Sequence, residues 1–165
     1  MAATHSQGDK TPRTERGRKT LRKLLDAAAT EFAEKGFHEA SISGITRSAG
    51  VALGTFYTYF DSKDAVFRAL VSDMSAGVGK AAREALDPSM GALEIERVAL
   101  RAFLEFAAEH KEIYRIIDEA EFVDPDSYRA HYETIGSRIE ERLKLGGESG
   151  EFAPGLGTPE AWAVM

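Results

Sequence analysis

The stretch that decides the fold is SISGITRSAGVALGTFYTYFDSK, residues 41–63. Ser41 is an N-cap residue, and the apolar residues after it recur at helical spacing until Gly50. A second short helix is predicted over residues 53–60. Two short helices joined by a tight turn are typical of a helix-turn-helix. Its expected internal contacts are Ile42, Ile45, Ala49, Val51 and Phe56.

Helical periodicity continues on both sides of this motif, and no segment alternates like a strand. The pattern predicts an amphipathic helix over 18–35, closed by Gly36 as its C-terminal cap. Further helices are expected from Asp61-Ser62 to the mid-80s, from Asp87-Pro88, over 111–121, from Asp124-Pro125 and from Thr158, with a loop at 146–157. Gly44 inside the first short helix costs about 1 kcal/mol relative to alanine, and the sequence gives no reason for it.

The predicted fold class is therefore all-α. A three-helix N-terminal domain with the helix-turn-helix is followed by a helical bundle. We expect a flexible basic arm at 1–17, the helix-turn-helix DNA-binding domain at 18–66, and the helical-bundle domain at 67–165. The last helix starts at Thr158, close to the end of the chain, so we expect the second domain to be truncated at its C-terminus.

Charge is distributed unevenly along the chain. The net charge is −6, but residues 1–70 hold eleven Lys and Arg against eight Asp and Glu, a balance of +3, which leaves −9 for residues 71–165. The basic part is the one with the helix-turn-helix, as nucleic-acid binding requires. The acidic part is either ordinary surface or a surface that repels DNA and so orients the basic end.

The remaining composition indicates a cytoplasmic protein. There are no cysteines, which excludes disulfides and thiolate metal sites. The first residues lack the apolar core of a signal peptide, and no stretch approaches the roughly 20 apolar residues of a membrane helix.

The stretch from Leu24 to Leu70 resembles the DNA-binding domain of TetR-type repressors. The resemblance runs without gaps and includes several motifs at once. The matching residues are Ala28, Phe32, Gly36, Phe37, Ser41, Ile42, Ile45, Ala49, Gly50, Val51, Gly54, Thr55, Phe56, Tyr57, Tyr59, Phe60, Ser62, Lys63, Asp64 and Phe67.

The resemblance implies that residues 67–165 are a regulatory domain for ligand binding and dimerisation. It implies a homodimer whose third helices enter successive major grooves of a palindromic operator. It implies base contacts from Ser43, Leu53, Gly54 and Thr58. It implies contacts to the DNA backbone from Ser41, Thr55, Tyr57, Tyr59 and Lys63. Arg18, Lys19 and Arg22 are added as phosphate partners on charge grounds.

TetR-like proteins also bind an apolar or amphipathic effector between the helices of the second domain. The candidates for lining such a pocket here are Phe103, Phe106, His110 and Tyr132, although a packed core would need the same residue types. A metal site from His110 and His131 with Glu119 or Glu121 has no ligand spacing to support it. We therefore expect no metal and no cofactor.

The predicted function is a ligand-responsive DNA-binding transcriptional regulator, a repressor that is released from its operator by a small effector. One alternative is a helical protein-interaction module with a vestigial helix-turn-helix. An enzyme using the bundle cleft is the other. It would lack a cysteine nucleophile, a phosphate-binding glycine loop and a two-histidine metal motif, so we expect a protein that is not an enzyme.

Overall fold

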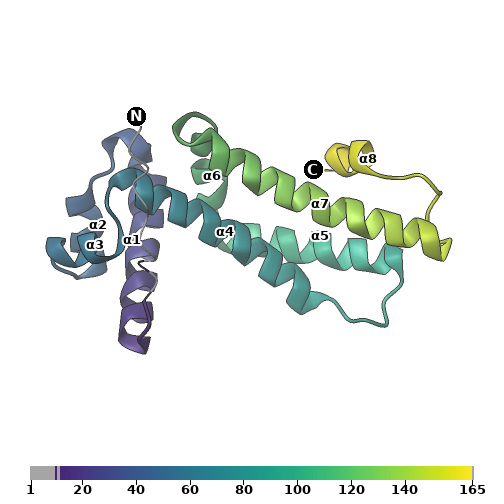
Figure 1. The fold of residues 1–165 in the computed structure, drawn as a ribbon, viewed down its shortest axis with the longest axis horizontal. Helices are drawn as coiled ribbons and strands as arrows, with labels where there is room; N and C mark the ends of the chain where they lie inside the picture. The colour runs from purple at the N-terminus through teal and green to yellow at the C-terminus, as the bar shows by residue number, and fades with distance from the viewer. Residues whose placement is uncertain (1–9, 11, 165) are drawn as a thin grey trace, which may run out of the picture. The chain divides into compact units, whose positions relative to one another are not determined.

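The computed structural model describes residues 10 and 12–164, and this part of the chain forms eight helices (Figure 1). They are α1 (Glu15–Glu39), α2 (Ile42–Ala49), α3 (Leu53–Tyr59), α4 (Lys63–Ala85), α5 (Ala92–Glu109), α6 (Glu112–Val123), α7 (Pro125–Ser149) and α8 (Thr158–Val164). The described residues contain no strand, which confirms the all-α prediction. Over the same residues, no helix is both long enough and apolar enough to cross a membrane.

Most of the expected N-terminal arm, residues 1–9 and 11, lies outside the described residues. Its last residues are helical, because α1 begins at Glu15 rather than at the expected residue 18. The Thr14 hydroxyl caps this helix by accepting from the Gly17 N–H at 3.1 Å. At the other end Gly36 has φ 75° and ψ 167°, a conformation open only to glycine, so the regular helix stops where the sequence predicts.

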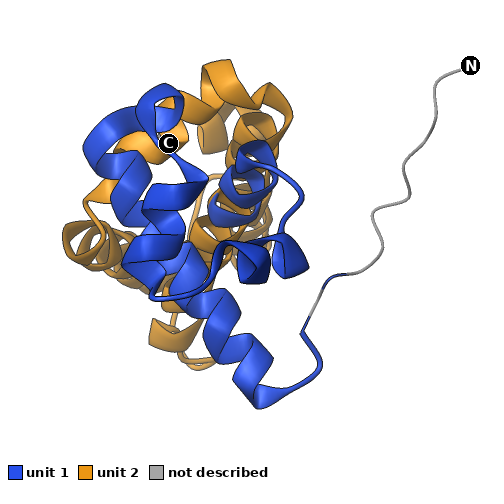
Figure 2. Ribbon diagram, turned by 90° about the vertical axis from the view of Figure 1, so that its left-hand side faces the viewer, with its two compact units in different colours: residues 1–70 blue, residues 71–165 orange. Residues whose placement is uncertain are grey.

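The helices form two compact units, residues 1–70 and residues 71–165, coloured separately in Figure 2. The expected boundary lay after residue 66. Helix α4 begins in the first unit and ends in the second, so it is the covalent connection between them.

The core of unit 1 is built on three phenylalanines from α1 and α4. Phe67 meets Phe32 and Phe37 edge to face, with ring centroids 5.2 and 5.1 Å apart. Such aromatic pairs add stabilisation beyond the area they bury. Around them lie the fully buried side chains of Leu24, Ile45, Phe56 and Val66.

Unit 2 is held together by specific contacts from α7 and α5. His131 on α7 makes a 2.6 Å hydrogen bond to the Ser75 hydroxyl on α4. Arg142 donates twice to the Glu96 carboxylate on α5, at 2.5 and 3.1 Å. On α4, a Cβ at Gly77 would lie only 2.7 Å from the Phe106 ring of α5, so the absence of a side chain there allows that ring to pack.

Two sequence-based element predictions were wrong. Asp87-Pro88 does not start a helix, because the Asp87 carboxylate accepts from the Ser89 N–H at 2.8 Å and forms a turn; α5 starts after Gly91. The prediction of a loop at 146–157 places its start too early, since α7 continues to Ser149 and ends at the left-handed Gly150. Phe152 folds back over Gly146, into space that a Cβ there would fill.

Candidate nucleic-acid interface

The helix-turn-helix has the caps that its sequence predicts. The Ser41 hydroxyl accepts from the Gly44 N–H at 3.0 Å and starts α2. Gly50 ends α2 in the left-handed conformation, with φ 66° and ψ 36°. The next N–H, that of Val51, donates to the Thr46 carbonyl at 3.0 Å, so the turn into α3 is fixed by hydrogen bonds on the main chain.

Helix α3 has one anchored side and one open side. Phe56 is fully buried, and Phe60 just after the helix is nearly so. Leu53 is 49% exposed and Tyr57 48%, and both Gly54 and Thr58 are exposed. Nothing lies within 4 Å of the position a Cβ on Gly54 would take, so this glycine leaves space on the outside of the helix. Three of the four predicted base-contact residues therefore share the open side.

The other predicted contact residues are less uniform. Ser43, the fourth base-contact residue, and Ser41 are exposed at the start of α2. Thr55 and Tyr59 are half-buried in α3. The Thr58 hydroxyl donates to the Gly54 carbonyl at 3.3 Å, so toward DNA it presents an acceptor. All these assignments as DNA contacts stay predictions.

Lys63 has partners inside unit 1 that the sequence did not reveal. Its Nζ donates to the carbonyls of Phe37, His38 and Ala40, at 2.6, 3.0 and 3.0 Å. The same Nζ lies 4.6 Å from the centroid of the Phe37 ring. These three bonds use all three donors of the ammonium group, so a phosphate would have to compete with the end of α1 for this side chain.

Glu31 has a similar role at the start of α2. Its buried carboxylate accepts from Lys35 Nζ at 2.8 Å and from the Ser41 N–H at 3.2 Å. Burial raises the pKa of this carboxyl, but the hydrogen bonds from Lys35 and Ser41, with the charges of Lys35 and Arg47, outweigh burial and lower it. The carboxylate occupies the space that a Cβ on Gly44 would need, which explains that glycine.

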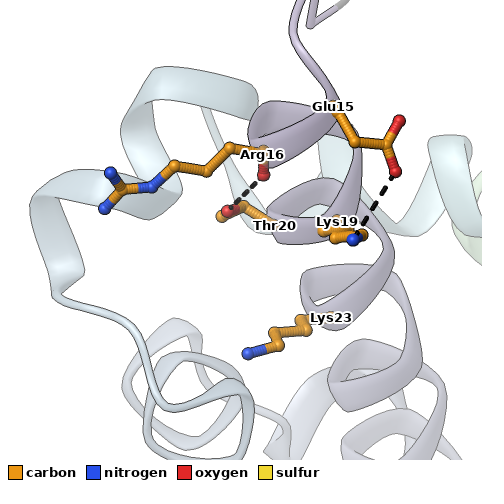
Figure 3. Close-up of a pocket in the computed structure, with 5 residues that line it drawn as sticks. All are labelled: Glu15, Arg16, Lys19, Thr20 and Lys23. Carbon is orange, nitrogen blue, oxygen red and sulfur yellow. Dashed lines mark hydrogen bonds and ion pairs between the residues drawn. The ribbon is translucent and has the colours of Figure 1, made fainter.

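The basic residues of α1 fall into two groups. Arg18 pairs with Glu15 at 2.9 Å, and Arg22 pairs with Asp26 at 2.8 Å. A different set lines a hollow of about 530 Å³ on the side of α1 shown in Figure 3: Glu15, Arg16, Lys19, Thr20 and Lys23. Of the three cations predicted from charge, only Lys19 lies at this hollow.

The residues predicted to line an effector pocket lie in unit 2, and the structure brings only some of them together. The rings of Phe106 and His110 are 4.5 Å apart at the end of α5. Tyr132 on α7 instead meets Tyr128 at 4.8 Å and the buried His131 at 5.0 Å. Phe103 is half-buried on α5. Within the described residues, no group of three or more His, Asp or Glu side chains is arranged to hold a metal ion.

Residues 24–70 match the family described as "Bacterial regulatory proteins, tetR family". This segment is that of a TetR-family regulator. The matched residues include the whole helix-turn-helix and the beginning of α4, which is the stretch whose resemblance to this family the sequence reveals.

Two HTH-type transcriptional regulators are similar to longer parts of the chain. The chain is 32% identical over 105 residues to the uncharacterized HTH-type transcriptional regulator YdgC of Bacillus subtilis, covering 61% of this chain and 54% of that protein. It is 30% identical over 122 residues to the transcriptional activator FasR of Mycolicibacterium smegmatis, covering 74% of this chain and 54% of FasR. The chain thus spans about half the length of these two relatives.

Solved structures share the fold of this chain. The fatty acid degradation regulator FadR of Bacillus halodurans superposes with a TM-score of 0.81 at 22% identity, covering 93% of this chain and 80% of that one. FadR of Bacillus subtilis in complex with stearoyl-CoA gives 0.73 at 23% identity, covering 84% of this chain and 77% of that one.

Proposed function

We propose that this chain is a ligand-responsive transcriptional regulator of the TetR family that binds a palindromic operator as a homodimer in the cytoplasm and acts as a repressor. The observation that carries the proposal is the open side of α3. Leu53, Gly54, Tyr57 and Thr58 are exposed there, while Phe56 anchors the helix to the core. A short helix held in this way can enter a major groove, where side chains and main chain meet base edges.

Tyr57 supports the docking mode. Its side chain is 48% exposed, although an aromatic ring gains more from burial than from exposure. A phenol beside a groove can donate to a phosphate oxygen while its ring covers the sugar.

The decisive experiment is selection of duplex fragments by the purified protein, followed by affinity measurements on the selected sequence. We expect Tyr57→Ala to weaken binding about tenfold at 0.15 M salt, the value of one hydrogen bond to a charged group. The matched control is Tyr114→Ala on α6, because Tyr114 is 51% exposed and lies in unit 2.

Two results would contradict the proposal. If no duplex is enriched by the wild-type protein, the interaction module with a vestigial helix-turn-helix replaces it. If Tyr57→Ala and Tyr114→Ala bind the selected duplex equally well, α3 does not dock as proposed. Circular dichroism on both variants checks that the helices are intact.

We further propose an apolar or amphipathic effector bound by unit 2. The aromatic and polar side chains of α5 and α7 support it, since Phe106 with His110 and Tyr132 with His131 combine ring surfaces with hydrogen-bonding groups. The B. subtilis FadR structure, which contains stearoyl-CoA, supports the choice of an acyl-chain compound as the first ligand to test.

A further inference from the structure

Intrahelical ion pairs divide the cations of α1 into two sets with different local charge. Arg18 lies 2.9 Å from the Glu15 carboxylate and Arg22 lies 2.8 Å from that of Asp26. These pairs are exposed and weak, but any phosphate that approaches either guanidinium also approaches its carboxylate. Within the described residues, the side chains of Arg16 and Lys23 have no such partner.

The cations that line the hollow lie on one side of α1, and of these only Lys19 is in an ion pair with another described residue, Glu15. Residues 16, 19, 20 and 23 are three, four and seven apart, which places them on one face of a helix. Figure 3 shows the Arg16 and Lys23 side chains extending to the same side of α1. Three cations, from Arg16, Lys19 and Lys23, meet one carboxylate in this hollow, that of Glu15, which lies 3.8 Å from Lys19 Nζ.

The hollow also lies on the part of α1 that is next to α3. A Cβ on Gly17 would be 3.6 Å from the Tyr59 hydroxyl at the end of α3. Lys10, just ahead of α1, donates to the Tyr57 carbonyl at 3.2 Å. When α3 occupies a major groove, the first turns of α1 therefore come close to the sugar-phosphate backbone that borders it.

The chemistry of the lining favours phosphate over a base or an apolar ligand. A guanidinium offers paired donors to phosphate oxygens, and an ammonium acts as a point charge. The Thr20 hydroxyl already donates to the Arg16 carbonyl at 3.0 Å, so it does not provide a free donor for base recognition. Such a surface binds DNA regardless of sequence.

We propose that Arg16, Lys19 and Lys23 bind backbone phosphates of duplex DNA beside the groove that α3 enters. This inference rests on the proposed function and identifies a contact surface on α1 that the recognition helix does not provide. It assigns a role in DNA binding to Arg16 and Lys23, which the charge pattern alone does not distinguish from their neighbours.

The test compares two double variants that remove the same charge from the same helix. Arg16→Gln/Lys23→Gln removes two of the charged side chains that line the hollow. Arg18→Gln/Arg22→Gln removes the two guanidinium groups that pair with Glu15 and Asp26. Affinity for the selected duplex and for a random duplex is measured from 0.05 to 0.3 M salt. We expect the first double variant to flatten the log–log salt slope by about 1.8 for each bound copy of the domain, on both duplexes. We expect the second to change it much less.

The outcomes separate this inference from the proposed function. If the wild-type protein binds no duplex, the function itself fails. If it binds and the two double variants have equal slopes, or the Arg18/Arg22 variant loses more, the function stands and the hollow is not a phosphate site. A loss confined to the selected duplex also overturns it, because phosphate contacts are independent of sequence.

A third variant keeps the test decisive if the Arg16/Lys23 variant does not fold. Glu15→Gln removes the one carboxylate of the hollow and leaves all three of its cations in place; because Glu15 also pairs with Arg18, this variant and the protein it is compared with both carry Arg18→Gln. We expect it to bind both duplexes more tightly than the Arg18→Gln protein at low salt. Unchanged or weaker binding by a folded Glu15→Gln protein would contradict the proposal.

Discussion

The Glu31 carboxylate and Gly44 pack together and so position α2 against α1. The Glu31 carboxylate receives the Ser41 N–H at 3.2 Å and fills the space beside the Gly44 main chain. Because its pKa is lowered, the ionised carboxylate stabilises unit 1 fully above its ordinary pKa of 4.5. That contribution is lost as the pH falls from there through the lowered pKa. A wrong side chain at either position would shift Ser41 and Ser43, two predicted DNA contacts.

Gly44→Ala is therefore expected to destabilise unit 1, although alanine is the better helix former. Overpacking of this kind costs about 1–3 kcal/mol, measured as the free energy of unfolding in urea. Shortening the carboxylate by one methylene, with Glu31→Asp in the Gly44→Ala background, should restore part of that loss.

The matched control is Gly54→Ala, because nothing lies within 4 Å of a Cβ there. It should stabilise the chain by about 0.5–1 kcal/mol. If Gly44→Ala is as stabilising as Gly54→Ala, the Glu31 carboxylate is free to move and its packing against Gly44 does not position α2.

At the scale of the elements, the sequence predicts a boundary well where one local cap determines it. Ser41 and Gly50 delimit α2, and the Ser62 hydroxyl accepts from the Ala65 N–H at 3.1 Å to start α4. The same logic fails at Asp87-Pro88, since an Asp-Pro pair is compatible with either a turn or a helix start. Here the hydrogen bond from the Ser89 N–H to the Asp87 carboxylate decides for the turn, and the Asp-Pro pair alone does not predict that bond.

Side-chain partners are harder to predict than boundaries. The carbonyls that receive Lys63 lie more than twenty residues earlier in the chain, and Glu31 and Ser41 are ten residues apart. A sequence pattern shows that Lys63 begins a helix and carries a charge. It does not show that the ammonium group is already engaged at the end of α1.

The contact between α4 and α7 predicts a pH dependence within unit 2. His131 is buried and hydrogen-bonded to Ser75, and burial lowers its pKa below the ordinary value of 6.5. The unfolded chain therefore binds a proton at a higher pH than the folded one. The contribution of His131 to stability should decline as the pH falls below about 6.5, and continue to decline until its lowered pKa is reached.

Thermal melts at pH 7.5 and pH 5.5 measure this effect. His131→Gln, which can keep a hydrogen bond to Ser75, should melt with a smaller pH dependence than the wild-type chain. His38→Gln, at an exposed histidine of unit 1, is the control and should keep the wild-type dependence. If the melting temperatures of all three proteins change equally between pH 7.5 and pH 5.5, unfolding does not change the protonation of His131.

At the scale of the whole molecule, the charge division of the sequence coincides with the structural division. Residues 1–70 carry +3 and form unit 1, and residues 71–165 carry −9 and form unit 2. Both interpretations of the acidic unit, ordinary surface or repulsion of DNA, are compatible with this arrangement. Regulation needs more than this division, because a ligand in unit 2 must change the affinity of unit 1 for DNA.

That requirement gives a prediction in two directions. If stearoyl-CoA lowers operator affinity by some factor, within roughly 5- to 150-fold, the operator must lower stearoyl-CoA affinity by the same factor. Fluorescence anisotropy of labelled duplex and calorimetric titration of the ligand measure the two factors. Coenzyme A without the acyl chain is the ligand control, and we expect it to have no effect on operator binding.

Variants locate the ligand within the same experiment. Tyr132→Ala should weaken stearoyl-CoA binding and leave operator affinity in its absence unchanged, whereas Tyr114→Ala on the exposed side of α6 should change neither. If the changes in operator affinity and in stearoyl-CoA affinity differ, the acyl compound displaces DNA by acting on the duplex or by aggregating the protein. If the two affinities change by equal factors and Tyr132→Ala leaves both changes unaltered, the effector does not bind beside α7. The proposal predicts that the two affinities change by equal factors in the wild-type protein and that both changes disappear in Tyr132→Ala but not in Tyr114→Ala. That result would show that the effector acts by binding unit 2, because a ligand shifts an equilibrium only by binding its two states differently.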